Sequence, residues 1–432
     1  MAHFSERNVL ARHGDSGHRL GRNILTLISG TFAAQLVTLA AIPILSRLYG
    51  PTPFGEFAVF SSVTTLVAVV GTARYEMGIV PPRSLREAVA VTNLGVRLLT
   101  ALSIVITAIG TVLVFMPIPS VWTGYLLLVG PGVFLLGYLS LVTQWHVRMA
   151  NYSLISRNRV VQSGMTAIAQ VAFGFLSSNW GVGLASGLLI GQLAGAILLT
   201  IATPERSRFF GRDDGRRWRY VVRKYWRLPA LLMPHTLIDS FRLNGVNLII
   251  GSFSVVALGQ YSQAWRLVQL PAGLIGSAIT QVYFPQLATV PRSELRQTVR
   301  SSVVKSLAFG AIPFAAIFLL SPFAFPFILG EDWAEAGRFA QALTPALYLN
   351  LAASPISTIF IVLRKEHIGL LFSLVYTGVS LAALFLFSSN LLFAVWIMSA
   401  CQAISLIGYV VLAFWLAGRQ PKRPGGAAQR GL

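Results

Sequence analysis

The stretch FAVFSSVTTLVAVVGTARYEMGIV, residues 57–80, decides the fold class of this chain. Up to Gly71 it contains no charged residue, and Arg74 and Glu76 then stand two residues apart. In a soluble protein this pair would mark a surface turn. Extended back to Phe54, however, the run is long enough to cross about 30 Å of hydrocarbon as a helix. The composition of the whole chain decides between these interpretations.

The chain is too apolar for a soluble fold. Of its 432 residues, 55% are hydrophobic and 11% are charged, against roughly a quarter charged in soluble domains. Long apolar runs recur from residue 24 to residue 417, without the alternation typical of an outer-membrane barrel. We therefore predict an all-α polytopic membrane protein. The single cysteine, Cys401, excludes a disulfide framework and a cysteine metal cluster.

The apolar runs predict twelve membrane-spanning helices. Alternate connections between them, together with the two tails, hold 27 of the 34 basic residues, whereas the other connections hold only Arg47 and Arg338. This bias places both termini in the cytoplasm and indicates a bacterial inner membrane. The net charge of +20 is thus topogenic, and no nucleic-acid partner is expected. The predicted spans are 24–45, 54–80, 89–116, 122–145, 159–177, 181–202, 228–252, 259–284, 302–328, 337–362, 367–387 and 391–416.

A basic segment divides the chain into two six-helix lobes. The motif FGEF at 54–57 opens the second span and LGQY at 258–261 opens the eighth, which favours a parallel repeat of the two lobes. The N-terminal segment lacks an apolar core, so we expect a basic tail rather than a cleavable signal. The predicted segments are a cytoplasmic tail 1–23, an N-terminal lobe 24–202, an amphipathic cytoplasmic linker 203–227, a C-terminal lobe 228–417 and a second basic tail 418–432.

Two helical sequence patterns occur next to the boundary between the lobes, one in the linker and one in the sixth span. In the linker, Trp218, Val221, Val222 and Tyr225 recur at i, i+3, i+4 and i+7. This spacing is typical of a helix lying on the anionic inner leaflet, although a solvated linker with topogenic charge accounts for the composition equally well. In the sixth span every fourth residue is glycine, which lets a neighbouring helix approach closely. We predict tight packing within the first lobe, with a sliding surface as the alternative. The stripe consists of Gly183, Gly187, Gly191 and Gly195.

Charged residues inside the spans are the candidate functional groups. If 54–80 is one helix, Arg74 and Glu76 are separated by about 200° around it and are not predicted to pair. Arg97, in the third span, reaches a similar depth, so a contact between Glu76 and Arg97 is the alternative. A further interpretation is that all three side chains snorkel to the inner headgroups.

The second set of charges lies deeper in the membrane. Asp239 and Arg242 are three residues apart on one face of the seventh span, and Arg266 lies about two turns into the eighth span from the outer side. A structural ion pair would account for the first two, and an outer-leaflet phosphate for Arg266. His146 and His235, near inner span ends, are interpreted as structural rather than as proton carriers.

Four intramembrane arginines against two carboxylates leave an excess of positive charge. Because such residues rarely face lipid, they predict a water-filled central cavity with a positive wall. The planar guanidinium suits phosphate better than the point charge of lysine does. Phosphate-loop, metal-site and nucleophile-elbow motifs are absent from the sequence, so we expect neither catalytic nor metal-ligating residues.

Several stretches resemble bacterial Wzx-type flippases of the polysaccharide transport family, and the resemblance extends from about residue 22 to residue 416. Its most specific parts are LSRLYGP followed by FGEF, the ARYE stretch and the LPAGLIGSAITQVYFP segment. The stretches concerned are ILSRLYGPTPFGEFAVF (44–60), TARYEMGIVPPRSLREA (72–88), KYWRLPALLMPHTLID (224–239) and GQYSQAWRLVQLPAGLIGSAITQVYFPQLA (259–288).

The resemblance implies a fold and a substrate. Members belong to the MOP exporter group, with twelve helices in two six-helix lobes around a central cavity (MATE-like). They move an undecaprenyl-diphosphate-linked oligosaccharide unit from the inner to the outer leaflet. Arg74 and Glu76 match the family's Arg-Tyr-Glu pattern, and Arg266 matches a usual basic residue. Asp239 and Arg242 fall where members vary.

We therefore expect a flippase that works by alternating access rather than an enzyme. Its diphosphate would enter near Arg74 and Arg97 and pass Arg242 toward Arg266. Glu76 or Asp239 would carry a coupling proton or sodium ion, and no other cofactor is expected. The expected partners are the lipid-linked glycan, membrane lipids, a polysaccharide polymerase and a chain-length regulator. The alternatives are a MATE-like drug or metabolite exporter and, from a third class, a membrane-bound polysaccharide polymerase or ligase.

Overall fold

The computed structural model describes residues 7–82, 84–117, 119–176, 181–204, 206–209, 216–289, 294–362 and 366–418. Within these ranges the chain is helical and contains no strand. It divides into two compact units, Met1–Leu248 and Ile249–Leu432. This boundary lies inside one helix, whereas the division predicted from charge lies in the linker that precedes that helix.

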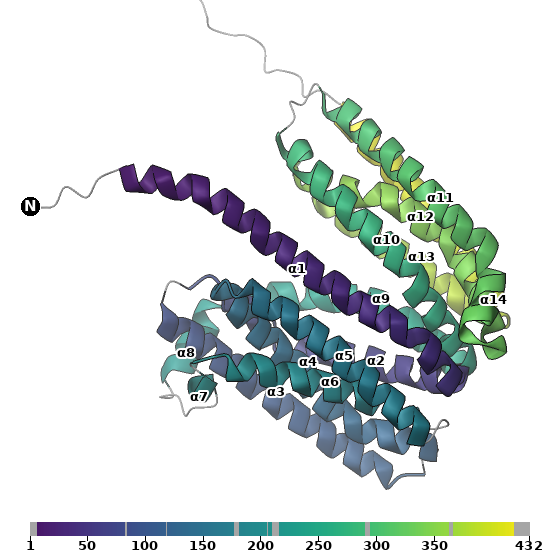
Figure 1. Cartoon of the computed structure of the whole chain (residues 1–432), viewed down its shortest axis with the longest axis horizontal. Helices are drawn as coiled ribbons and strands as arrows, with labels where there is room; N and C mark the ends of the chain where they lie inside the picture. Colours follow the sequence, from purple (N-terminus) through teal and green to yellow (C-terminus); the bar gives the residue numbers. More distant parts are fainter. Residues whose placement is uncertain are drawn as a thin grey trace, which may run out of the picture. The chain divides into compact units, whose positions relative to one another are not determined.

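Unit 1 holds the first six long helices, two short linker helices and most of a seventh long helix (Figure 1). Its elements are α1 (Arg7–Leu48), α2 (Pro51–Gly71), the 3-10 turn η1 (Tyr75–Gly78), α3 (Leu85–Val114), α4 (Ser120–Arg148), α5 (Tyr152–Leu176), α6 (Val182–Ile201), α7 (Arg206–Phe209), α8 (Arg216–Lys224), the π-helical η2 (Leu228–Leu232) and α9 (Met233–Phe253).

Unit 2 holds the end of α9 and five further long helices. They are α10 (Val255–Thr289), α11 (Leu295–Leu329), α12 (Ala334–Val362), α13 (Glu366–Leu386) and α14 (Leu391–Gly418), with the short turn η3 (Glu331–Trp333) between α11 and α12. The described part of the chain thus contains twelve long helices, and each overlaps one predicted span. The prediction of an all-helical, multi-pass fold is confirmed.

Seven segments of these helices are long and apolar enough to cross a membrane, and α9 and α10, which carry the deeper charges, are not among them. The segments are Thr26–Leu48, Pro51–Gly71, Leu85–Val114, Trp122–Arg148, Val182–Ile201, Arg296–Leu329 and Leu391–Leu416. Two predicted boundaries need correction. The N-terminal tail is helical from Arg7 and continuous with the first span. The second span ends at Gly71 instead of residue 80.

A buried apolar cluster holds α3, α4 and the linker together in unit 1. Trp145 of α4 and Phe209 of α7 are both buried, and their rings meet edge to face with centroids 4.9 Å apart. Asn93 of α3 donates to the carbonyl of Phe209 at 2.9 Å. Val221 of α8 is fully buried in the same cluster. Burying side chains of this size contributes about 1.5–3 kcal/mol each when the alternative is water.

One end of unit 1 gathers the connections that the charge pattern places in the cytoplasm. Arg148, at the end of α4, donates to the carbonyl oxygens of Ile79 at 3.2 Å and Val80 at 2.9 Å. Glu87, in the first turn of α3, pairs with Lys224 and accepts a hydrogen bond from Tyr225 at 3.0 Å. We refer to this end, defined by these six residues, as the linker end of unit 1.

The glycine stripe of α6 faces α5. A Cβ added at Gly187 would lie 2.8 Å from the backbone nitrogen of Gln170, and one at Gly191 would lie 2.6 Å from the carbonyl oxygen of Gln162. Real Cβ atoms do not approach backbone atoms so closely. The stripe therefore lets α5 and α6 pack with their backbones in near contact, as small residues do between membrane helices.

Unit 2 is centred on α12, which packs against α10, α11 and α14. Tyr261 of α10 and Phe339 of α12 meet edge to face with ring centroids 6.2 Å apart. The side chain of Gln260 donates to the carbonyl of Asp332 at 2.6 Å and accepts from the amide of Ala336 at 2.9 Å. This glutamine belongs to the motif that opens α10, and it caps the start of α12.

Candidate functional site

The turn that follows α2 is the most distorted backbone in unit 1. Ala73 and Arg74 have positive φ angles of 46° and 62°, a region that costs roughly 1–2 kcal/mol for residues with a Cβ. Tyr75 donates its amide to the carbonyl of Thr72 at 2.9 Å, and η1 follows. Two successive left-handed residues interrupt the helix, which ends at Gly71, nine residues before the end of the predicted span.

This turn brings Arg74 and Glu76 together. Their Nη1 and Oε1 atoms are 2.9 Å apart, and the side chains are 21% and 3% exposed. The prediction that they do not pair is therefore wrong, because the 200° separation holds only for a continuous helix. Nε of Arg74 and Oε2 of Glu76 are buried and have no partner within the described structure. Leaving buried polar atoms without a hydrogen-bond partner is energetically costly. The two atoms are therefore available to bind a ligand, a water molecule or a proton.

Arg97 lies on α3 with its side chain exposed. It belongs to unit 1, as do Arg74 and Glu76. The ion-pair partner that the structure gives Glu76 is Arg74 of its own turn, and the alternative contact between Glu76 and Arg97 stays a prediction.

The charges of α9 form a short row. Asp239 Oδ1 lies 3.6 Å from Arg242 Nε, and Asp239 Oδ2 lies 3.7 Å from His235 Nδ1. All three side chains are at least one-third exposed. The row begins directly after the π-helical turn η2, a distortion that is frequent at functional sites. Sequence reasoning missed the place of His235 in this row, although its spacing of four from Asp239 was a readable signal.

Arg266, on α10 in unit 2, forms no hydrogen bond or ion pair with any residue that the structure describes. Its side chain is half-buried. Gln263, one turn earlier, is fully buried, and both its amide nitrogen and its amide oxygen lack partners in the same part of the chain. With Gln260, these residues make a polar row along α10 with a spacing of three. The spacing was visible in the sequence, but the burial of Gln263 was not.

A second buried carboxyl escaped the sequence analysis. Glu56, the acidic residue of the FGEF motif in α2, is 8% exposed and accepts a hydrogen bond from Tyr125 of α4 at 3.1 Å. A Cβ at Gly181, just before α6, would lie 2.5 Å from its Oε2 atom. The motif therefore joins the starts of α2, α4 and α6 at the end of unit 1 opposite the linker end.

His146 has a structural position. Its Nε2 lies 3.0 Å from the carbonyl oxygen of Leu199 and 3.2 Å from Thr203 Oγ1, and its Nδ1 lies 3.3 Å from Asn151 Nδ2. The ring is 1% exposed. With both ring nitrogens engaged, His146 ties the end of α4 to the end of α6.

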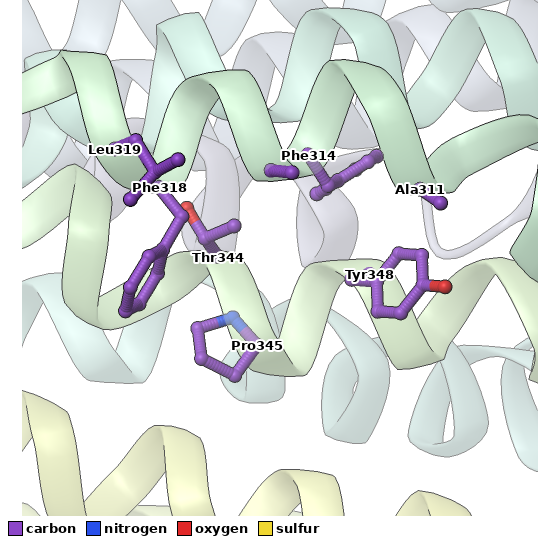
Figure 2. A pocket seen from close by; sticks show the side chains of 8 residues that line it. Ala311, Phe314, Phe318, Leu319, Thr344, Pro345 and Tyr348 are labelled. Carbon is purple, nitrogen blue, oxygen red and sulfur yellow. The ribbon is translucent and has the colours of Figure 1, made fainter.

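One apolar pocket has no charged residue in its lining. It lies between α11 and α12 in unit 2 and has a volume of about 380 Å³. Figure 2 shows Phe314 and Phe318 on α11 facing Pro345 and Tyr348 on α12. Because its lining is almost entirely carbon, this pocket fits a hydrocarbon chain and offers nothing to a phosphate. The lining residues are Ala311, Phe314, Ala315, Phe318, Leu319, Thr344, Pro345 and Tyr348.

Comparison with known proteins defines the class to which this fold belongs. One similar structure is an inward-facing multidrug resistance MATE family transporter of the MOP superfamily, at a TM-score of 0.67 and 14% identity, covering 91% of this chain and 98% of the other. Another is the lipid II flippase MurJ in an inward closed conformation, at a TM-score of 0.70 and 12% identity, covering 91% and 90%. The chain thus shares its fold with these two proteins.

The family follows from the sequence of the chain. A family model described as polysaccharide biosynthesis protein matches residues 44–338, which is more than half of the chain, so the protein belongs to that family. No curated protein sequence matches it. The predicted resemblance to polysaccharide transport proteins with a MATE-like architecture is confirmed at the level of family and fold.

Proposed function

We propose that the protein is a flippase for lipid-linked glycans. It moves undecaprenyl-diphosphate-linked oligosaccharide units from the inner to the outer leaflet of the bacterial inner membrane, for synthesis of O-antigen, capsule or exopolysaccharide. Family membership carries this proposal. The fold alone does not distinguish it, because a multidrug transporter and a lipid II flippase both share that fold.

The arginines serve the diphosphate of the substrate. Arg74 and Arg97 receive it on the inner side, and it passes Arg242 toward Arg266. Two observations support this path: the buried Nε of Arg74 lacks a partner among the described residues, and so does the whole guanidinium of Arg266. An arginine without a protein acceptor inside a membrane helix is expensive, and a phosphate oxygen is the acceptor that its fork fits best.

Two carboxyl groups are suited to coupling. Glu76 is almost fully buried, and its Oε2 atom has no hydrogen-bond partner among the described residues, so this oxygen is available to a coupling proton or ion. Asp239 is 46% exposed between His235 and Arg242, so a sodium ion or a proton can reach it. Either exchange would accompany alternating access of the two lobes, with both termini in the cytoplasm.

A drug or metabolite exporter is the second candidate, favoured by the likeness to the MATE transporter. Exporters of cations need acidic cavity residues, whereas the intramembrane charges here are chiefly arginine. A polymerase or ligase would need polar catalytic groups outside the membrane, and the outer connections are too short for them. The proposed partners are therefore the glycan lipid, membrane lipids, the polymerase and its chain-length regulator.

A deletion strain tests the function directly. We expect surface polysaccharide to disappear and lipid-linked repeat units to accumulate on the cytoplasmic side, with both effects reversed by the gene on a plasmid. Sensitivity to cationic drugs should not change. Normal polysaccharide together with new drug sensitivity would overturn the flippase assignment in favour of the exporter.

Variants at Arg266 test the phosphate path. Arg266→Ala should abolish export while protein abundance stays normal, and Arg266→Lys should restore part of it because charge returns without the planar fork. Arg338→Ala is the matched control, since this exposed arginine of unit 2 lies near the start of α12, at the end that we predict to face outward. Full export by Arg266→Ala would rule out the role of Arg266.

A further inference from the structure

Helix α8 carries two different faces. The first is the docked face, formed by Val221 and Tyr225, which packs on unit 1. The second consists of Arg219, Val222 and Arg223 of α8 together with Trp226, which lies in the turn two residues after the helix ends, and all four are exposed. We call these four residues the outer stripe of α8. The predicted amphipathic pattern placed Val221 on the membrane, and the structure corrects this by burying it in the protein.

The docked face fixes the direction of the outer stripe. Lys224 and Tyr225 both bond to Glu87 in the first turn of α3, and the hydrogen bond to Glu87 raises the pKa of the Lys224 ammonium above its ordinary value. A Cβ at Gly78 would lie 3.0 Å from Leu228 and 3.6 Å from Tyr225, so η1 also packs on the linker. The helix is therefore held on unit 1 and is not a free connection.

The same contacts place α8 at the lipid–water boundary. Glu87 is the third residue of the membrane-length segment Leu85–Val114, so a helix bonded to Glu87 lies beside the point where that segment leaves the hydrocarbon. Charge segregation places this end on the cytoplasmic side, where anionic lipids create a negative surface potential. The outer stripe is thus at the level of the phosphate groups.

The chemistry of this face matches that level. The residues of α8, Arg216–Lys224, include five basic side chains and no acidic one. Arg219 lies over the ring of Trp218 at 5.5 Å, and Arg227 lies over the ring of Trp226 at 6.0 Å. Trp226 itself is 53% exposed. Water alone does not favour an exposed indole next to an aliphatic side chain, whereas the headgroup region suits both an indole and a guanidinium.

We propose that the outer stripe of α8 binds the headgroups of anionic phospholipids in the inner leaflet. Arg219 and Arg223 contact the phosphates, and Trp226 inserts between the headgroups with Val222. This lipid site is separate from the glycan-lipid path, and it attaches the linker between the lobes to the membrane. The ligand of this site is the surface of the bilayer. Positive and aromatic side chains, which lie together at the level of the headgroups, select it.

Lipid binding by the full-length protein tests the proposal. The protein is purified free of lipid, and its thermal stability is measured after titration with micelle-dispersed phosphatidylglycerol and, separately, phosphatidylcholine. We expect phosphatidylglycerol to bind more tightly than phosphatidylcholine. The Arg219→Gln/Arg223→Gln variant should bind it roughly thirty-fold more weakly, at about 1 kcal/mol for each charge removed.

Three comparisons make this result specific. Arg219→Lys/Arg223→Lys should retain most of the affinity, because a surface potential responds to charge. Arg296→Gln/Arg300→Gln removes two exposed arginines at the predicted cytoplasmic end of unit 2 and should leave the affinity unchanged. Equal losses in the Arg296/Arg300 and Arg219/Arg223 variants, or equal binding of both lipids to the wild type, would overturn the proposal.

A labelling experiment covers the case in which the glutamine variant does not fold. Val222→Cys in a Cys401→Ser background carries an environment-sensitive dye in nanodiscs of phosphatidylcholine with or without phosphatidylglycerol. The emission should shift to the blue only with phosphatidylglycerol and return at high salt. A dye that stays in water in both nanodiscs would exclude lipid contact and would leave an acidic soluble protein as the partner of this face.

Discussion

Arg74 holds a backbone conformation that its own Cβ disfavours, and it does so beside a buried carboxylate. The strain of the left-handed turn is compensated by an ion pair at 2.9 Å that a continuous helix would not permit. Residues in strained backbone conformations are frequent at functional sites, and they persist only where the surrounding contacts hold that conformation in place. The turn is therefore the residue-level feature that we would test first.

The backbone strain of this turn can be measured at Ala73, the residue before Arg74. Ala73→Gly removes the Cβ from a position with φ of 46°, so we expect thermal unfolding in detergent to show a gain of about 1 kcal/mol. Ala68→Gly, in the buried helical part of α2, should instead lose about 1 kcal/mol. Equal losses in both variants would show that Ala73 is not strained.

A double-mutant cycle tests the ion pair. Arg74→Ala leaves Glu76 buried and unpaired, and we expect a loss of about 2 kcal/mol, reduced from the fully buried case because part of Arg74 reaches water. Adding Glu76→Gln to this variant should recover about half of the loss. Unfolding curves in detergent give each corner of the cycle, and additive losses would contradict a direct contact.

The residues of this site were predictable by type but not by arrangement. Arginine and glutamate at the end of an apolar run identified the place. The sequence from Thr72 to Met77 does not predict a left-handed turn, because neither alanine nor arginine favours the left-handed backbone conformation. The same limit applied to Gln263, whose burial depends on which helices surround α10.

At the scale of helices, the sixth span shows how a sequence pattern becomes packing. The spacing of glycines in α6 was enough to predict a close neighbour, and the neighbour is α5. Gly191 is the tightest position, since an added Cβ would lie 1.9 Å from Thr166 Oγ1 and 2.6 Å from the carbonyl oxygen of Gln162. Backbone atoms cannot move away as a side chain can.

A pair of substitutions separates packing from helix propensity. Gly191→Ala should destabilise unit 1 by about 2 kcal/mol through overpacking. Gly164→Ala, on α5, meets nothing within 4 Å and should gain up to about 1 kcal/mol from the better helix propensity of alanine. Melting temperatures by fluorescence-detected gel filtration compare the two, and a similar response of both would refute the close contact.

The sequence predicted helix starts best where polar or turn-forming residues come directly before an apolar run. The starts of α6, α13 and α14 lie within one residue of the predicted spans, because polar or turn-forming residues precede them in the sequence. The linker helix was predicted from its periodicity. The surface on which this helix packs was not predictable, because an apolar stripe has the same spacing whether it contacts lipid or protein. Only the contacts of Glu87 and Val221 show that it packs on unit 1.

For the whole molecule, charge bias predicts which connections face the cytoplasm. Contacts within unit 1 agree with this, since the connections after η1, α4 and α6 meet at the linker end, while the starts of α2, α4 and α6 meet at the other. The count of twelve helices was predictable from hydropathy. The division of compact units inside α9 was not, because hydropathy carries no information about which helices associate.

Cysteine accessibility tests the orientation. In a Cys401→Ser background, Tyr220→Cys on α8 and Glu331→Cys between α11 and α12 are both exposed positions. A maleimide that cannot cross membranes should label only Glu331→Cys in intact spheroplasts and both variants in inverted vesicles. Labelling of Tyr220→Cys from outside would reverse the predicted topology.

The two hydrogen bonds that Arg148 makes to successive carbonyls of Ile79 and Val80 have a consequence for sequence divergence. One guanidinium nitrogen, Nη1 of Arg148, donates both bonds and so holds the end of a turn that lies some seventy residues earlier in the chain. Relatives that lose the arginine should therefore also lose the distorted turn and regain an unbroken second helix. Covariation between these two distant places would reveal, from alignments alone, which homologues retain the kinked geometry.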